Sequence, residues 1–238
     1  MEITPATYER WRETTLGPIT ERLEREAVFS LVPAIAGLAV LDAGCGDGTY
    51  AIEASRRGAV VAGLDSSAPM LAAAREREQE ILSRAAILWC RGKVEALPFG
   101  DACFDLVFLI TVLCWVRARS QAMREVARVL RPGGILLLGE LGRLSSWALV
   151  RTVRGWLGSR LWKEAHFWTA GELRTLLQDA GLEPGAARGA VYYPPLASCA
   201  ALASRCDRSL SVLGGWGAAF LAIRAVKPGQ AKSTSPVA

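Results

Sequence analysis

Residue types that build metal centres and membrane spans are scarce in this sequence. One histidine is present, His166, and the six cysteines form no C-x-x-C pair, so we expect no metal site. No apolar run approaches the roughly 18 residues of a membrane-spanning helix. Residues 1–5 lack the basic segment and apolar stretch of a signal peptide, which predicts a cytoplasmic protein with reduced cysteines.

The composition that remains is typical of one globular domain. Of the 238 residues, 51% are apolar, which suits a parallel sheet that helices bury on both faces. We expect a single domain over residues 1–227 and a disordered tail over residues 228–238. The net charge of +5 is only a weak indication of an acidic partner.

The stretch VLDAGCGDGTY, residues 40–50, joins a predicted strand to a predicted helix. Residues 37–41 form a short apolar run, and residues 51–57 have the pattern of the first turns of a helix. A strand, a glycine turn and a helix in this order predict a nucleotide-binding crossover. Gly44 and Gly46 suit the turn because they leave no side chain between the backbone and a ligand.

The residues around the glycine turn favour one kind of nucleotide. A dinucleotide site prefers G-x-G-x-x-G, but here the third glycine, Gly48, comes one residue early. Asp42 and Asp47 flank the turn, and two carboxylates would repel a pyrophosphate. They would attract a ligand that carries an ammonium and a sulfonium group. The sequence therefore predicts S-adenosylmethionine rather than NAD.

A further acid follows at the end of the next apolar run. Residues 59–64 form a second predicted strand, and Asp65 follows directly at its end. An acid at this place can accept hydrogen bonds from both ribose hydroxyls. The alternative is that Asp65 only caps the helix that begins near Ala68. The glycine turn and the acid together favour the ribose role.

Taken together, the motifs resemble a known family. LDAGCGDGT, GLDSSAPML, EALPFGDACFDLV, RVLRPGG and GAAFLAIRAVK are similar to those of class I S-adenosylmethionine-dependent methyltransferases, in the group that includes the ubiquinone and menaquinone C-methyltransferases. The resemblance runs from about Tyr8 to Lys227. It implies a Rossmann-like α/β fold: a seven-stranded, mostly parallel sheet with helices on both faces and an antiparallel last strand.

The resemblance also implies where the cofactor binds. A helical segment, residues 5–32, would fold over it through Tyr8 and Trp11, unless these rings simply pack on the core. Met70 would contact the adenine or serve as a core residue, and Lys93 stands where relatives carry an acid. The predicted cofactor-binding residues are Tyr8, Trp11, Asp42, Gly44, Cys45, Gly46, Asp65, Ser66, Met70, Val94, Glu95 and Thr111.

The acceptor side is predicted with less detail. The Asn/Asp-Pro-Pro-aromatic turn of nucleobase methyltransferases is missing after the fourth strand, residues 104–110, so we expect a small molecule and no nucleic acid. Residues 141–168 are rich in Trp and Arg, without an acid between Leu141 and Lys163, and are expected to cover the acceptor as a helical lid. An additional role predicted for this segment is contact with a membrane surface. The alternative to a lid is that the segment packs permanently on the sheet. The predicted acceptor residues are Trp115, Trp156, Trp162 and Trp168.

Two questions of chemistry stay open in the sequence. His166 is either a general base or hydrogen-bond donor at the mouth of the site or a structural histidine. Cysteines 45, 114, 199 and 206 raise an arsenic-methylating alternative, although buried thiols explain them more simply. The two function classes are an enzyme that methylates a small hydrophobic or aromatic molecule, and a cofactor-binding regulatory or assembly protein without turnover.

Overall fold

We describe a computed structural model of the chain. It describes residues 4–32, 34–81, 87–198, 200, 204, 207–211 and 215–229. Of the expected tail at 228–238, residues 230–238 lie outside the described residues, as do Cys199 and Cys206.

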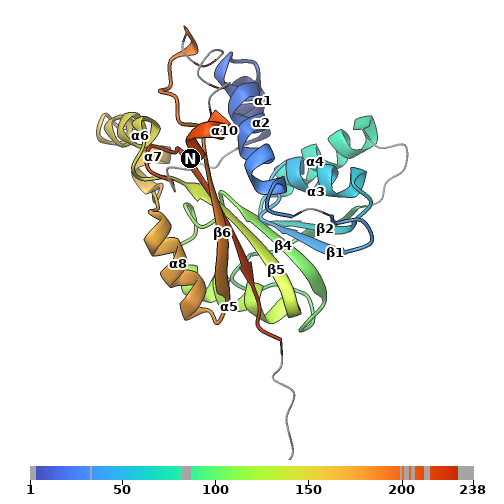
Figure 1. Ribbon diagram of the computed structural model, residues 1–238. Helices are drawn as coiled ribbons and strands as arrows, with labels where there is room; N and C mark the ends of the chain where they lie inside the picture. Colours follow the sequence, from blue (N-terminus) through green and yellow to red (C-terminus); the bar gives the residue numbers. More distant parts are fainter. Residues whose placement is uncertain are drawn as a thin grey trace, which may run out of the picture.

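The centre of the molecule is one seven-stranded sheet with the strand order β3-β2-β1-β4-β5-β7-β6. Strands β1 to β5 run parallel, and β7 pairs antiparallel with both β5 and β6 (Figure 1). This confirms the predicted fold class. The strands are β1 (Ala39–Ala43), β2 (Val60–Asp65), β3 (Ile87–Arg91), β4 (Phe104–Ile110), β5 (Leu130–Leu141), β6 (Glu183–Ala190) and β7 (Phe220–Val226).

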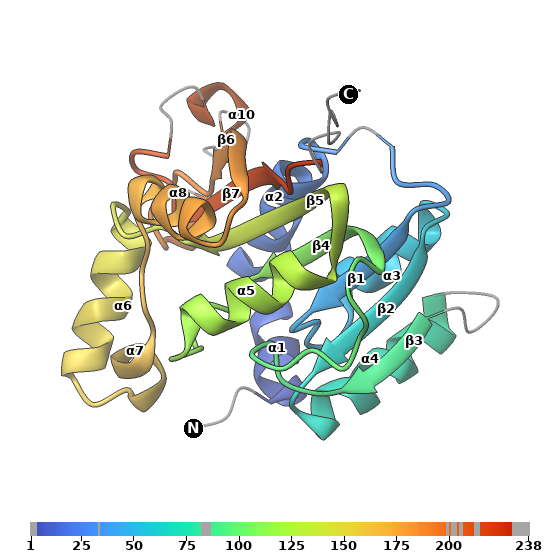
Figure 2. The ribbon, with the colours of Figure 1, turned by 90° about the horizontal axis from the view of Figure 1, so that it is seen from below.

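Helices cover both faces of the sheet, as buried parallel strands require (Figure 2). Helices α2, α3 and α4 pack on one face, and α5 and α8 on the other. The helices are α1 (Pro5–Arg12), α2 (Leu16–Phe29), α3 (Thr49–Arg56), α4 (Ala68–Ile81), α5 (Arg119–Val129), α6 (Ser146–Trp156), α7 (Arg160–Glu164), α8 (Ala170–Asp179) and α10 (Asp207–Leu210).

Local sequence accounts for individual helices. In α5, Ala122, Met123, Val126 and Val129 are fully buried, at the spacing of one helix face. Helix α8 begins with a capping box, in which the Thr169 side chain accepts from the Glu172 amide.

Two segments that were expected to be helical, residues 5–32 and the lid within residues 141–168, are each interrupted. The break between α1 and α2 lies at residues 13–15, whereas Gly17 and Pro18 lie in the first turn of α2. Proline is tolerated there because the first-turn amides have no partner within the helix. Residues 145–163 are not one helix: α6 ends before Gly158, whose φ of 104° suits glycine, and α7 follows.

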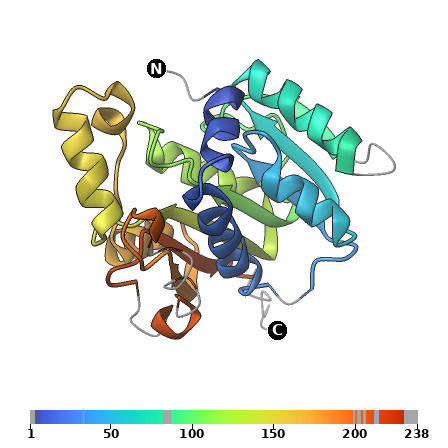
Figure 3. The same ribbon diagram turned by 90° about the horizontal axis from the view of Figure 1, so that it is seen from above.

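The carboxyl ends of the parallel strands lie beneath two groups of helices, α1 with α2 and α6 with α7. Figure 3 shows α1 and α2 in dark blue between the α6–α7 pair in yellow and the α3–α4 pair in cyan. No described helix is long and apolar enough to cross a bilayer.

Candidate active site

A large cavity opens at the carboxyl ends of β1, β2 and β4, where open α/β sheets bind their ligands. Its volume is about 1260 Å³, and α1, α2 and α6 contribute to its wall. All of the predicted cofactor-binding residues line it: Tyr8, Trp11, Asp42, Gly44, Cys45, Gly46, Asp65, Ser66, Met70, Val94, Glu95 and Thr111.

The glycine turn after β1 is held from below by the end of β2. The amides of Gly44 and Cys45 both donate to the Leu64 carbonyl, at 2.7 and 2.9 Å. Gly44 has a φ of 81°, and a Cβ there would lie 2.4 Å from Cγ2 of Val112. Only glycine therefore lets the turn approach the loop after β4 this closely.

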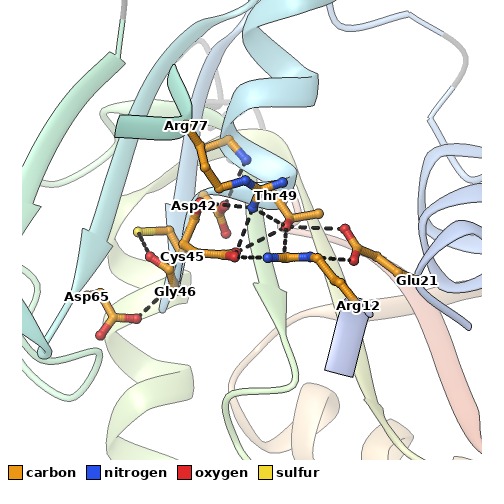
Figure 4. A network of polar contacts seen from close by, with 10 residues as sticks. Arg12, Glu21, Asp42, Cys45, Gly46, Thr49, Asp65 and Arg77 are labelled. Atoms are coloured by element: carbon orange, nitrogen blue, oxygen red, sulfur yellow. Dashed lines mark hydrogen bonds and ion pairs between the residues drawn. The ribbon is translucent and has the colours of Figure 1, made fainter. Parts of the chain in front are cut away.

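Asp65 is fixed at the tip of β2 by two backbone amides. One carboxylate oxygen accepts from Gly46 at 2.9 Å (Figure 4). The other accepts from Ser67 at 2.8 Å. The Ser67 contact lies just before α4, so a helix-capping role and a ligand role are both compatible with this geometry. Each oxygen keeps a further lone pair, and the residue lines the cavity.

The two acids that flank the glycine turn have different surroundings. Asp42 is 2% exposed and accepts from the Ala51 amide, and burial raises its pKa to about 7. Asp47 forms ion pairs with Arg12 and Arg77. Burial acts to raise the pKa of Asp47, but Arg12 and Arg77 outweigh it and lower the pKa below its ordinary value. Both acids were expected to attract a cationic ligand. At Asp47, most of this negative charge is already compensated by the two arginines.

A polar network joins α1 to the glycine turn, which the sequence did not predict. Besides Asp47, Arg12 binds Glu21 at 2.9 Å and Thr49 at 3.0 Å (Figure 4). Arg77 donates to the backbone oxygen of Asp47 at 3.1 Å. The network therefore fastens the N-terminal helices to the part of the sheet that carries the cofactor motif.

The aromatic residues of α1 line the cavity and also pack on the core. The Trp11 ring meets the Trp147 ring edge-on at 5.9 Å, so α1 contacts α6. Burial raises the pKa of Tyr8 above its ordinary value. At the other end of the cavity, Met70 and Val94 are 4% and 5% exposed and offer an apolar surface for an adenine.

Glu140 organises the loop after β4, a role that the sequence did not reveal. Its fully buried carboxylate accepts three consecutive amides, from Val112 at 3.1 Å, Leu113 at 2.7 Å and Cys114 at 3.1 Å. Burial raises the pKa of Glu140 to about 7, although the three amides favour the charged form. An acid at the end of an apolar strand was the available signal, because such a charge needs partners.

The predicted acceptor residues fall into two groups. Trp115 and Trp162 line the cavity with ring centroids 6.1 Å apart. Trp156 is 81% exposed and Trp168 is 6% exposed in the core, and neither is among the residues that line the cavity. The structure therefore brings two of the four tryptophans to the acceptor side.

His166 is half-buried and is not among the residues that line the cavity. Its ring contacts Trp168 edge-on at 4.5 Å, and its backbone amide donates to the Cys114 carbonyl at 2.9 Å. Burial lowers the pKa of His166, and Arg119 and Arg143 lower it further. This placement favours the structural role over that of a general base.

The two buried cysteines that the structure describes, Cys45 and Cys114, offer little for metal or thiol chemistry. Among the residues that the structure describes, no group of His, Cys, Asp and Glu could hold a metal ion. Burial raises the pKa of Cys45 and of Cys114, so both are held as thiols.

Comparison with known sequences relates part of the chain to methyltransferases. Residues 41–138 match the family model of a methyltransferase domain. The malonyl-[acyl-carrier protein] O-methyltransferase of Pectobacterium atrosepticum is 36% identical over 134 residues, which are 56% of this chain and 48% of that protein. An uncharacterised protein of Mycobacterium tuberculosis is 32% identical over 190 residues, 80% of this chain and 62% of the other. The chain thus spans about half to three-fifths of the length of these relatives.

Solved structures agree over nearly the whole chain. An S-adenosylmethionine-dependent methyltransferase from Thermotoga maritima has a TM-score of 0.72 at 25% identity, covering 93% of this chain and 95% of that one. Magnesium protoporphyrin IX methyltransferase from Synechocystis, solved with bound S-adenosylhomocysteine, has a TM-score of 0.69 at 18% identity, a likeness of fold. Residues 41–138 thus carry a methyltransferase domain, and the chain as a whole has the fold of the class I S-adenosylmethionine-dependent methyltransferases.

The residues of the cavity fit the cofactor of this class. The carboxylate oxygens of Asp65 could accept from a ribose diol, and Met70 and Val94 would offer an apolar surface to an adenine. Between these residues and Thr111, at the end of β4, the cavity is continuous past the glycine turn. An accepting carboxylate beside an apolar surface suits an adenosine ligand that carries no pyrophosphate.

Proposed function

We propose that this chain transfers a methyl group from S-adenosylmethionine to a small, hydrophobic or aromatic acceptor. The observation that carries the proposal is one continuous cavity, which runs from Asp65 past Thr111 to the aromatic wall of Trp115 and Trp162. The methyl donor and an apolar acceptor would meet at the end of β4. Named relatives act on small acceptor groups, namely malonyl-[acyl-carrier protein] and magnesium protoporphyrin IX, which supports a small acceptor for this chain.

The chemistry requires mainly orientation. S-adenosylmethionine, when bound, supplies an electrophilic methyl group on a sulfonium centre. The chain would hold the ribose through Asp65 and fix the loop at residues 111–114 through Glu140. Helices α1 and α6 would exclude water from the space between them, and alignment without water provides much of the acceleration of such a reaction. A protein base is needed only if the nucleophile keeps its proton.

Residues 141–168 would act as the lid over the acceptor, and their outer side supports an additional membrane contact. Leu149, Val153 and Trp156 of α6 are exposed at 66%, 38% and 81%, at the spacing of one helix face. Arg160 and Lys163 follow in α7 and are also exposed. Apolar residues beside basic ones are typical of a segment that lies on an anionic membrane.

Sedimentation with vesicles tests the membrane role. The protein should pellet with phosphatidylglycerol vesicles more than with phosphatidylcholine vesicles, and a Trp156→Ala variant should pellet less. Equal sedimentation of both proteins with both vesicles would limit residues 141–168 to covering the acceptor.

Methyl transfer is tested with labelled cofactor and extracts of the producing cell, followed by mass spectrometry of the product. We expect a labelled small molecule and micromolar binding of S-adenosylmethionine and S-adenosylhomocysteine. Cofactor binding without any labelled product would favour the regulatory or assembly role. A preference for NAD would contradict the assignment of the site.

A further inference from the structure

One arginine in the acceptor part of the cavity is held by aromatic rings rather than by acids. Arg151 lines the cavity on α6, and its guanidinium carbon lies 5.0 Å from the Trp147 ring centroid and 4.8 Å from that of Trp162. Two ring contacts fix the orientation of a planar guanidinium and leave its N–H donors free. The side chain is therefore positioned in advance of any ligand.

Arg151 forms no ion pair with an acid among the residues that the structure describes. Among the described residues, no carboxylate lies within 4.0 Å of its guanidinium, whereas Arg12 in the same cavity pairs with both Glu21 and Asp47. Burial lowers the pKa of Arg151, although Glu24 opposes this effect. A cation that is desolvated and unpaired gains more from a bound anion than a surface arginine does.

Glu24 is the acid whose charge acts most on Arg151, and it lines the same cavity from α2. Burial raises the pKa of Glu24 to about 7, while the charge of Arg151 lowers it. A group with this pKa is easily protonated near neutral pH, so it offers only partial charge compensation to Arg151.

We propose that Arg151 binds a carboxylate group of the methyl acceptor, so that the acceptor is an apolar or aromatic carboxylic acid. The planar fork of a guanidinium matches a carboxylate through two parallel N–H···O bonds. A doubly charged phosphate is disfavoured because Glu24 faces the same space. Trp115, Trp162 and the methylene groups of the lid would then hold the apolar part. The assignment rests on the proposed function only in naming the ligand as the methyl acceptor.

Calorimetry on the full chain saturated with S-adenosylhomocysteine tests the inference without turnover. The probes are benzoate and 2-naphthoate, each compared with its uncharged carboxamide, and 2-naphthyl phosphate. We expect at least one acid to bind about tenfold or more tightly than its amide, as a charge-assisted pair implies. If the acids bind no better than their amides, whether both bind or neither, the assignment is overturned. Tighter binding of the phosphate would overturn the choice of a carboxylate.

Variants separate the role of Arg151 from general charge. Arg151→Met should abolish the preference for the acid, and Arg151→Lys should keep only part of it, because an ammonium lacks the fork. Arg160→Met is the matched control from the same segment, since Arg160 is exposed and absent from the cavity lining, and it should keep the preference.

Glu24→Gln removes the opposing charge and should bind the acid at least as tightly as the wild type. Weaker binding by Glu24→Gln, or an unchanged preference in Arg151→Met, would contradict the inference. Binding of S-adenosylhomocysteine to each variant is measured first. If the wild type itself does not bind S-adenosylhomocysteine, the proposed function is refuted instead.

Discussion

Different interactions build the two sides of the cavity. We call the side at the glycine turn, where we propose that the cofactor binds, the cofactor side, and the side at α6 and α7, where we propose that the acceptor binds, the acceptor side. On the cofactor side, backbone amides and short polar side chains fix each other, as in the contacts of Asp65 with Gly46 and Ser67. On the acceptor side, rings and cations from distant segments meet, as in the contacts of Arg151 with Trp147 and Trp162. The first kind of contact is directional and close to the sheet. The second depends on how α1, α6 and α7 pack.

The difference indicates how each side would tolerate change. A hydrogen-bonded turn next to buried strands cannot shift without leaving polar groups unpaired. An aromatic wall can be replaced by another of different shape while the sheet and its loops stay intact. We therefore expect substitutions on the cofactor side to affect cofactor affinity, and those on the acceptor side to affect only the acceptor.

The largest expected effect is that of Asp65→Ala on cofactor binding. Removing the carboxylate leaves the Gly46 amide and the ribose hydroxyls without an acceptor, which should weaken binding by about 1–3 kcal/mol. Calorimetric titration with S-adenosylhomocysteine measures the change. Equal affinity of variant and wild type would show that Asp65 serves only to cap α4.

Glu140→Gln should weaken the fold by on the order of 1 kcal/mol, since an amide cannot accept all three backbone N–H groups. The variant should also alter the pH dependence of stability. The folded chain raises the pKa of Glu140 from 4.5 to about 7 and so binds its proton more tightly than the unfolded chain does. This contribution is fully present below pH 4.5 and is lost as pH rises through about 7.

Melting temperatures between pH 5 and pH 8 measure both parts of the Glu140 prediction. The wild type should lose more stability over this range than the variant does. Asp42 has a raised pKa of the same origin and supplies a common background in both proteins. Parallel curves would show that Glu140 is charged in the folded chain throughout this range.

Trp162→Ala should raise the KM for the acceptor several-fold and leave cofactor affinity unchanged. The matched control is Trp156→Ala, because Trp156 lies on the neighbouring helix but is 81% exposed. A change in cofactor affinity for Trp162→Ala would contradict the separation of the two sides. A lowered melting temperature with unchanged KM would assign Trp162 to packing.

His166→Ala should have the smallest effect. The ring contacts Trp168 and does not line the cavity, so turnover across pH should stay within about twofold of the wild type and the melting temperature should fall slightly. Turnover that loses its pH dependence in this variant would restore His166 as a general base.

Sequence patterns predicted the sheet, its helices and the cofactor side because these depend on local order. The strand, the glycine turn and the acid at the end of the next strand lie close together in the sequence. The contact of Arg12 with Asp47 spans 35 positions, and the place of Arg151 depends on rings from α6 and α7. No local pattern records such pairs. The basic residues of 141–168 were therefore expected as a group, without a distinction between Arg151 and its exposed neighbours.

The ion pair between Arg12 and Asp47 connects α1, on one wall of the cavity, to the glycine turn after β1, on the opposite wall. If α1 moves away so that ligands can pass, Asp47 keeps Arg77 but loses Arg12, and Glu21 loses its ion pair with Arg12 but keeps its contact with Thr49. Passage of ligands is therefore coupled to the breaking of ionic contacts, whose strength falls as dissolved salt increases. Release of the spent cofactor should accordingly be a salt-sensitive step, and a turnover limited by that step would rise with ionic strength.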